Sequence, residues 1–228
     1  MSDIDLLPFF ALTGPRFTGR ATVMPLLRTA LRGEFPMQEF FFCTPFKPPL
    51  TCPLLFSEEE WDLQPTTRLF EDWALLNECA YQIREAQKRR AICVSLGFGL
   101  DVILHAATKR GFEIDDPDVA EVIKVHGDLV QMRLYQQHLR PPFYFVTEST
   151  PEAISDRMIQ FAPQLTGISP SVRRRFAKYE MSLADRYEAE VPHQTGFHHV
   201  EASHRAEVML ENILPIAVAR IRAWQEAT

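Results

Sequence analysis

Short apolar runs alternate along this chain with segments whose apolar residues recur at helical spacing. Runs typical of buried strands cover residues 6–12, 37–43, 90–96, 143–147 and 197–200. Segments typical of helices cover 20–32, 66–88, 100–109, 117–138, 151–161, 170–190 and 202–225. Strands separated by helices of this length pair in parallel and are covered by helices on both faces. The alternation therefore predicts a three-layer α/β protein with a central parallel sheet of about five strands.

The chain has the size and composition of one folded domain. It has 228 residues, of which 46% are hydrophobic and 24% charged, close to the average of globular proteins. Residues 44–65 contain five prolines and are predicted to form a loop. Because no internal repeat or linker divides the sequence, we predict a single domain over residues 1–228.

Charge and cysteine usage restrict the partners and the compartment. The net charge of −6 disfavours binding to nucleic acid or to an anionic membrane surface. No apolar run is long enough to span a bilayer, and the first residues do not resemble a signal peptide. Four cysteines (Cys43, Cys52, Cys79 and Cys93) show no CxxC spacing, which indicates reduced thiols. We therefore expect an intracellular, cytoplasmic protein that does not bind membranes.

The junction between the first strand and the first helix carries the strongest motif. Residues 14–22 read GPRFTGRAT, and two of only nine glycines in the chain lie here. The segment nearly matches GxxxxGK[ST], a loop whose backbone amides hold phosphates, and ligands in such folds bind beyond the first strand. However, Arg20 stands where the motif has lysine, and Ala21 stands where it has the magnesium-binding hydroxyl. A tight turn into a helix is the alternative interpretation.

Three later segments extend this pattern to a family. They are PPFYFVTESTPEAISDRM (141–158), SPSVRRRFAKYEMSLADRY (169–187) and FHHVEASHRAEVMLENIL (197–214). With the loop, they resemble thymidylate kinase and the related deoxynucleoside kinases in the order of elements over nearly the whole chain. The resemblance implies a P-loop nucleoside or nucleotide kinase fold, with a lid-like segment at about 162–175.

The sequence departs from this family where catalysis takes place. Phosphoryl transfer requires a cation on the β- and γ-phosphates, a magnesium ligand and an acidic group near the acceptor. The family carries an acidic residue and an arginine at the end of its third strand, where this chain reads CVSL (93–96). At the end of the second strand, where the family places Arg or Glu, this chain reads CTPF (43–46), and Lys47 is the only nearby charge. The combined departures suggest loss of catalysis.

Several residues remain as candidates for binding an anion. Arginine binds phosphate with two parallel hydrogen bonds, and the start of a helix offers free amides. The candidates for binding phosphate or nucleotide are Gly14, Arg16, Thr18, Gly19, Arg20, Thr22, Arg157, Arg173, Arg174 and Arg175. A solvated helix start is the alternative interpretation for Arg173 to Arg175. No metal site is predicted, because His198 and His199 would face opposite sides of a strand.

Two hypotheses about function follow. The leading one is a catalytically degenerate relative of thymidylate kinase that binds phosphate or nucleotide weakly and acts through a protein partner or as a homodimer. The alternative is a divergent phosphotransferase that uses Arg20 in place of lysine and acts on a nucleoside, a nucleotide or a nucleic-acid-borne acceptor. Only the alternative requires ATP and magnesium. Its candidate catalytic residues are Arg20, Lys47 and Asp101, and Asp101 would favour it if it lies at the carboxyl edge of the sheet.

Overall fold

Five parallel strands form the centre of the molecule. The computed structural model of the chain describes residues 7–44, 65–101, 142–190, 196–202 and 205–228. The strands are β1 (Phe9–Thr13), β2 (Phe40–Cys43), β3 (Ile92–Leu96), β4 (Phe143–Glu148) and β5 (Phe197–Glu201). They form one sheet in the order β2-β3-β1-β4-β5, in which every neighbouring pair is parallel. The predicted α/β class and the parallel sheet are confirmed.

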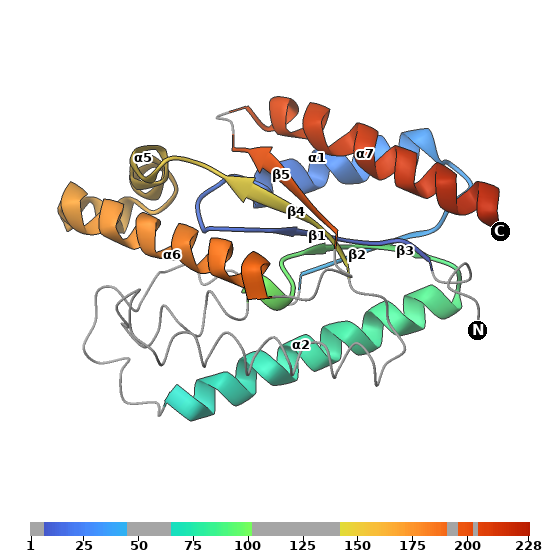
Figure 1. Ribbon diagram of the computed structural model, residues 1–228, viewed down its shortest axis with the longest axis horizontal. Helices are drawn as coiled ribbons and strands as arrows, with labels where there is room; N and C mark the ends of the chain where they lie inside the picture. Colours follow the sequence, from blue (N-terminus) through green and yellow to red (C-terminus); the bar gives the residue numbers. More distant parts are fainter. Residues whose placement is uncertain (1–6, 45–64, 102–141, 191–195, 203–204) are drawn as a thin grey trace.

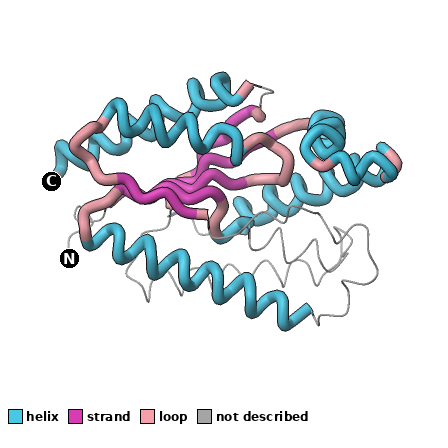
Figure 2. The backbone as a smooth tube through the Cα atoms, turned by 180° about the vertical axis from the view of Figure 1, so that it is seen from behind, coloured by secondary structure: helices cyan, strands magenta, loops and turns pink. Residues whose placement is uncertain are grey.

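The helices form layers on both faces of this sheet. Figure 1 shows α1 (Arg20–Glu34) and α7 (Ala206–Ala227) on one face and α2 (Pro65–Lys88) on the other. The helices α5 (Pro151–Phe161) and α6 (Pro170–Glu190), joined by the 3-10 helix η4 (Pro163–Gly167), lie beyond the carboxyl ends of the strands. The reverse view in Figure 2 shows the same layers. Within the described part of the chain, no helix is both long and apolar enough to cross a membrane.

For most helices and strands, the bounds predicted from the sequence agree with those in the structure. The predicted helices 151–161 and 170–190 coincide with α5 and α6. The predicted start of the last helix at residue 202 is wrong, because Ala202 follows β5 as coil and α7 begins at Ala206. The first strand begins at Phe9 rather than at residue 6. Most of the predicted helix 100–109, all of the predicted helix 117–138 and most of the loop 44–65 lie outside the described residues.

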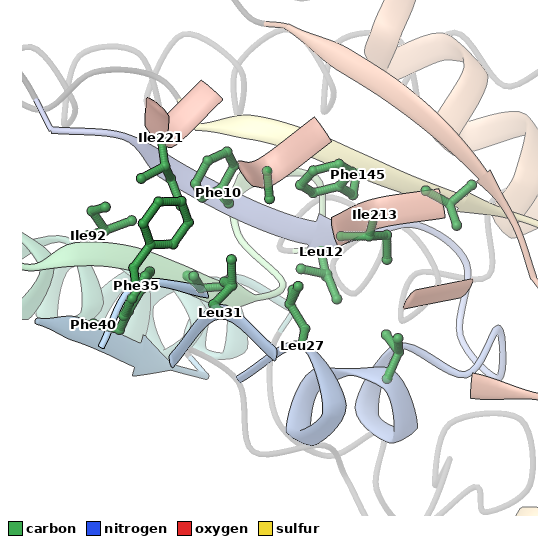
Figure 3. Close-up of a cluster of buried hydrophobic side chains, with 14 of the residues drawn as sticks. Phe10, Leu12, Leu27, Leu31, Phe35, Phe40, Ile92, Phe145, Ile213 and Ile221 are labelled. Carbon is green, nitrogen blue, oxygen red and sulfur yellow. The ribbon is translucent and has the colours of Figure 1, made fainter. Parts of the chain in front are cut away.

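One apolar core lies between the sheet and the helices α1 and α7. Val23, Leu27 and Leu31 recur every four residues along α1 and are fully buried. The inner face of α7 follows the same spacing from Met209 to Ile221. Between the helices and the sheet, Figure 3 shows Phe10, Leu12 and Phe145 among these side chains. This core holds α1, and therefore the loop that precedes it, against the central strand.

A second apolar core fills the opposite face. Alternate residues of β1, Phe9 and Ala11, point toward α2, because neighbouring side chains of a strand face opposite sides. They pack with Ile83 of α2 and with Phe98, whose ring contacts the ring of Phe9 edge to face at 5.0 Å. Since β1 lies between two cores, the loop at its carboxyl end starts from a rigid position.

Candidate functional site

The loop between β1 and α1 is held in a tight conformation by its glycines and by β4. Gly14 has φ +123, and a Cβ at this position would lie 2.6 Å from the carbonyl oxygen of Thr147. Gly19, the N-cap of α1, has φ +92, and no side chain caps the helix. The hydroxyl of Thr18 donates to the carbonyl of Pro15 at 2.7 Å and lies 2.6 Å from the hydroxyl of Thr147. The backbone of residues 14–19 therefore has the close turn and the open helix start that an anion-binding loop requires.

The first cation of the loop is held by a carboxylate from α6. The amide of Arg16 donates to Oε2 of Glu180 at 2.6 Å, and its Nε donates to Oε1 at 2.5 Å. The Glu180 side chain is fully buried, and the guanidinium of Arg16 lies over the ring of Phe176 at 5.2 Å. A carboxylate of the chain itself thus occupies a backbone amide of the loop where a phosphate oxygen would be expected to bind.

The second cation of the loop pairs with Asp101. Arg20 forms an ion pair with Oδ1 of this carboxylate, and both side chains are mostly buried. Oδ2 accepts hydrogen bonds from Thr13 Oγ1 at 2.5 Å and from the amide of Phe98 at 3.0 Å. Because Thr13 ends β1 and Asp101 follows β3, the pair lies at the carboxyl edge of the sheet. This position meets the condition that favours the phosphotransferase alternative.

A third arginine lies buried beside the loop. Arg157 of α5 is 3% exposed, and its Nη1 donates to the carbonyl of Phe17 at 3.4 Å. Burial lowers the pKa of Arg157 from its ordinary value. Its Nη2 is buried without an acceptor, and no carboxylate of the described residues forms an ion pair with it. Unlike Arg16 and Arg20, this cation has no anionic partner within the described part of the molecule.

The remaining predicted site residues lie in different surroundings. Arg173 is buried and bridges elements: its Nε donates to Ser155 Oγ of α5 at 3.2 Å and its Nη1 donates to the carbonyl of Ile168. Arg174 and Arg175 are exposed on α6, and Thr22 is exposed on α1. Lys47 lies outside the described residues. The structure therefore brings together residues 14–20, Asp101 and Arg157, whereas Arg173 ties α6 to α5.

Glu180, Thr13 and Thr147 also belong to this site, and the predicted set of site residues does not include them. For Glu180 a signal existed. The buried positions of α6 follow helical spacing and are Arg173, Phe176, Ala177, Glu180, Leu183 and Ala184. A carboxylate on the apolar face of a helix needs a partner that donates hydrogen bonds. The identity of that partner was not readable, because Arg16 lies 164 positions away in the sequence.

A second polar cluster lies at the ends of β4 and β5. Nδ1 of His199 contacts Glu148, and its Nε2 lies 3.1 Å from Oε2 of Glu188 on α6. Burial, together with the charge of Glu148, raises the pKa of Asp185 and that of Glu188, although His199 opposes both shifts. Among the residues that the structure describes, no group of three or more His, Cys, Asp or Glu side chains is arranged to hold a metal ion.

Comparisons with known proteins agree with the architecture. No family model and no curated protein matches the sequence. A solved structure, thymidylate kinase from Ehrlichia chaffeensis, superimposes with a TM-score of 0.53 at 15% sequence identity, over 92% of this chain and 99% of that one. At this identity the likeness establishes the fold. The chain therefore has a thymidylate-kinase-like P-loop fold, as its sequence pattern predicts.

Proposed function

We propose that this chain is a catalytically degenerate thymidylate-kinase-like protein, which retains weak binding of phosphate or nucleotide at the loop 14–19 and acts through protein contacts. The observation that carries the proposal is that both cations of the loop are neutralised by carboxylates of the same chain. Glu180 holds Arg16, and Asp101 holds Arg20. In an active kinase, the cation that follows the second glycine must be available to the β- and γ-phosphates.

The energetics of these pairs support weak rather than tight binding. A nucleotide that used both arginines would have to separate two largely buried ion pairs and leave Glu180 without its partners. Removing one member of a buried pair costs on the order of 3–5 kcal/mol. That cost subtracts directly from the affinity for a polyphosphate, because each 1.4 kcal/mol is a factor of ten in Kd.

Features that favour an anion remain at the same place. Arg157 has a buried Nη2 without an acceptor, its Nη1 donates to the carbonyl of Phe17, and Gly14 lets the loop turn tightly against Thr147. A bound phosphate oxygen would supply the acceptor that Arg157 lacks. These features support binding of one phosphate group without a metal ion.

The role through protein contacts follows from the loss of chemistry, and we propose a homodimer or a protein partner inside the cell. Met37 is 97% exposed and Phe161 is 59% exposed, so apolar side chains are available on the surface. The described cysteines are free thiols, which fits a reducing compartment. Sedimentation at several concentrations measures the oligomeric state directly.

Calorimetric titration with ATP, with and without Mg²⁺, tests the proposal. We expect millimolar or weaker binding that magnesium does not strengthen, and no ADP formation. Arg222→Ala is a matched control for Arg20→Ala, because Arg222 is exposed on α7 and pairs with Glu34 far from the loop. Magnesium-dependent binding at micromolar affinity that is lost in Arg20→Ala and kept in Arg222→Ala would overturn the degenerate assignment.

One observation favours the alternative phosphotransferase. Asp101 lies at the carboxyl edge of the sheet, next to Thr13 and Arg20. Magnesium is commonly held by one or two carboxylates together with substrate phosphates, so this carboxylate stands where such an ion could be bound if Arg20 turned toward a phosphate. The test measures ADP release with nucleoside, nucleotide and oligonucleotide acceptors. Activity that Asp101→Asn abolishes, in a variant that still folds, would establish the alternative.

A further inference from the structure

Two cysteine thiols that are distant in the sequence meet at the edge of the sheet. Cys43 is the last residue of β2, and Cys79 lies in the middle of α2. Their sulfur atoms are 3.6 Å apart, and the Cys79 thiol donates to the sulfur of Cys43. The two residues are 36 positions apart in the sequence, so the folded chain creates the contact. Both are free thiols in the structure.

The two thiols have unequal surroundings. Cys43 is half-buried and therefore reachable from solvent, whereas Cys79 is 3% exposed. The hydrogen bond from Cys79 lowers the pKa of Cys43 against the opposing effect of burial, and Ser95, its partner across the β2–β3 pairing, lowers it further. The same contact and burial raise the pKa of Cys79. A reachable sulfur whose pKa is lowered, in contact with a buried second thiol, is the arrangement of an attacking and a resolving cysteine.

We propose that Cys43 and Cys79 form a reversible dithiol pair that hydrogen peroxide oxidises to a disulfide. The Cys43 thiolate attacks one oxygen of the peroxide, the O–O bond breaks, and Cys43 becomes a sulfenic acid while hydroxide leaves and takes up a proton. The sulfur of Cys79 then attacks the sulfur of Cys43, the S–O bond breaks, and the leaving hydroxide takes up the proton of Cys79 and departs as water. Two thiols lose two electrons in total, and the peroxide gains them as it becomes two waters.

Cys93 provides an internal contrast. It lies on β3 in the same apolar core, is fully buried, and donates to the carbonyls of Ile83 and Ala91. Burial raises the pKa of Cys93, and the nearby Cys43 adds to this effect. The structure therefore assigns no oxidation chemistry to Cys93, although it is close to the pair.

A disulfide here would join the carboxyl end of β2 to α2. A cross-link that closes a long loop stabilises the folded state mainly by restricting the unfolded chain. For a protein of this size we expect Tm to rise by about 5 °C on oxidation. The proposal is independent of the proposed function, because Cys43 and Cys79 make no contact with residues 14–20 among the described interactions. If the Cys43–Cys79 proposal fails, the proposed function is unaffected, and the reverse also holds.

The test uses the full-length protein, both unaltered and with Cys52→Ser, since Cys52 lies outside the described residues. Each protein is treated with hydrogen peroxide, its remaining thiols are alkylated, and its peptides are identified by mass spectrometry. We expect a peptide pair linked through Cys43 and Cys79, loss of two free thiols per chain, and reversal by dithiothreitol. Cys93→Ser is the matched control and should leave the link unchanged.

Two further variants separate the steps. In Cys79→Ala, oxidised Cys43 should remain as a sulfenic acid that a dimedone probe traps, and Cys43→Ala should abolish both products. Circular dichroism of each variant establishes that it folds. The proposal is overturned if Cys43 is not oxidised before Cys93, if no Cys43–Cys79 link forms in the Cys52→Ser protein, or if the link forms but dithiothreitol does not reverse it.

Discussion

The apolar core beneath α1 and α7 and the polar edge around the loop 14–19 share the strand β1, but different interactions hold them. In the core, side chains such as Leu27 and Ile213 are fully buried and contribute through the area that they remove from water. At the edge, Glu180, Arg157 and Thr18 are also buried, yet each is charged or polar and needs a specific partner. The stability of the core depends on the area of apolar surface that it buries, whereas that of the polar edge depends on each buried polar or charged group having its hydrogen-bond or ion-pair partner.

The difference has a consequence for how each region tolerates change. A truncation in an apolar core costs the burial of the atoms removed, together with a cost that rises with the cavity left behind. A buried charge that loses its partner costs desolvation, but the protein can retain the fold and gain affinity for a substitute partner from solution. The core therefore contributes mainly to stability, and the edge is where we propose that a ligand binds.

Truncation of Leu27 should produce the largest effect. Leu27→Ala removes a fully buried side chain between α1 and the sheet, and we expect a loss of about 3 kcal/mol in the free energy of unfolding. Urea unfolding followed by circular dichroism measures it. Thr29→Ala, on the exposed side of the same helix, should change this free energy by less than about 0.5 kcal/mol. Equal effects at both positions would show that α1 does not pack as described.

At the polar edge around the loop 14–19, the addition of one methyl group at Gly14 should lower stability nearly as much as Leu27→Ala does. Gly14→Ala places a Cβ 2.6 Å from the Thr147 carbonyl at φ +123, so both contact and conformation are unfavourable. We expect a loss of about 2 kcal/mol in the free energy of unfolding.

Gly33 is the matched control for Gly14. Nothing lies within 4 Å of a Cβ at Gly33, which is in α1, so Gly33→Ala should stabilise the protein by about 0.5 kcal/mol. Urea unfolding measures the change in the free energy of unfolding for both variants, and we expect the two changes to have opposite signs. A stabilising Gly14→Ala would mean that the loop does not adopt this conformation.

The two regions also differ in how far the sequence predicts them. The helices α1, α5 and α6 and all five strands follow from local spacing, since an apolar stripe must face a core whatever the core contains. The start of α7 was predicted four residues early, because the apolar and helix-forming residues around Ala202 carry no stop signal, although β5 ends there. Local patterns determine elements better than their ends.

The site was predictable only in part for a related reason. Gly14, Gly19 and Arg20 stand in a recognisable order, and Asp101 is a candidate on the condition that it lies at the carboxyl edge of the sheet. The pairings of Arg16 with Glu180 and of Arg20 with Asp101 join residues 164 and 81 positions apart, and no local rule determines them. Whether a loop arginine is available to a ligand is therefore a property of the fold, which the motif alone does not reveal.

Removal of the negative charge at Glu180 should strengthen anion binding and also lower stability, because Glu180 is the buried partner of Arg16. Glu180→Gln keeps an oxygen that can accept from the Arg16 amide, but it releases the Arg16 guanidinium from its anionic partner. We expect the affinity for inorganic phosphate or pyrophosphate to rise about tenfold, equivalent to about 1.4 kcal/mol, as measured by calorimetry. Glu211→Gln, exposed on α7, changes the net charge equally and should leave the affinity unchanged. Equal gains in both variants would attribute the effect to net charge.

The smallest effect should come from the acidic cluster beside β5, which lies at the same edge but is partly exposed. Burial raises the pKa of Glu188, so the folded protein binds a proton at this carboxyl group more tightly than the unfolded chain does. The stability that this proton contributes is present below the ordinary glutamate pKa and is lost as pH rises through the pKa of Glu188 in the folded protein. In Glu188→Gln no carboxyl group ionises at this position, so the variant does not lose this stability as pH rises, although the contact with His199 is also weakened. The variant should therefore gain stability relative to the unaltered protein between pH 4.5 and 7, by less than about 1 kcal/mol. Urea unfolding at the two pH values measures this difference. A difference that is constant with pH would place the charge of Glu188 in solvent, and one that grows toward acid would mean that His199 lowers the pKa of Glu188 instead.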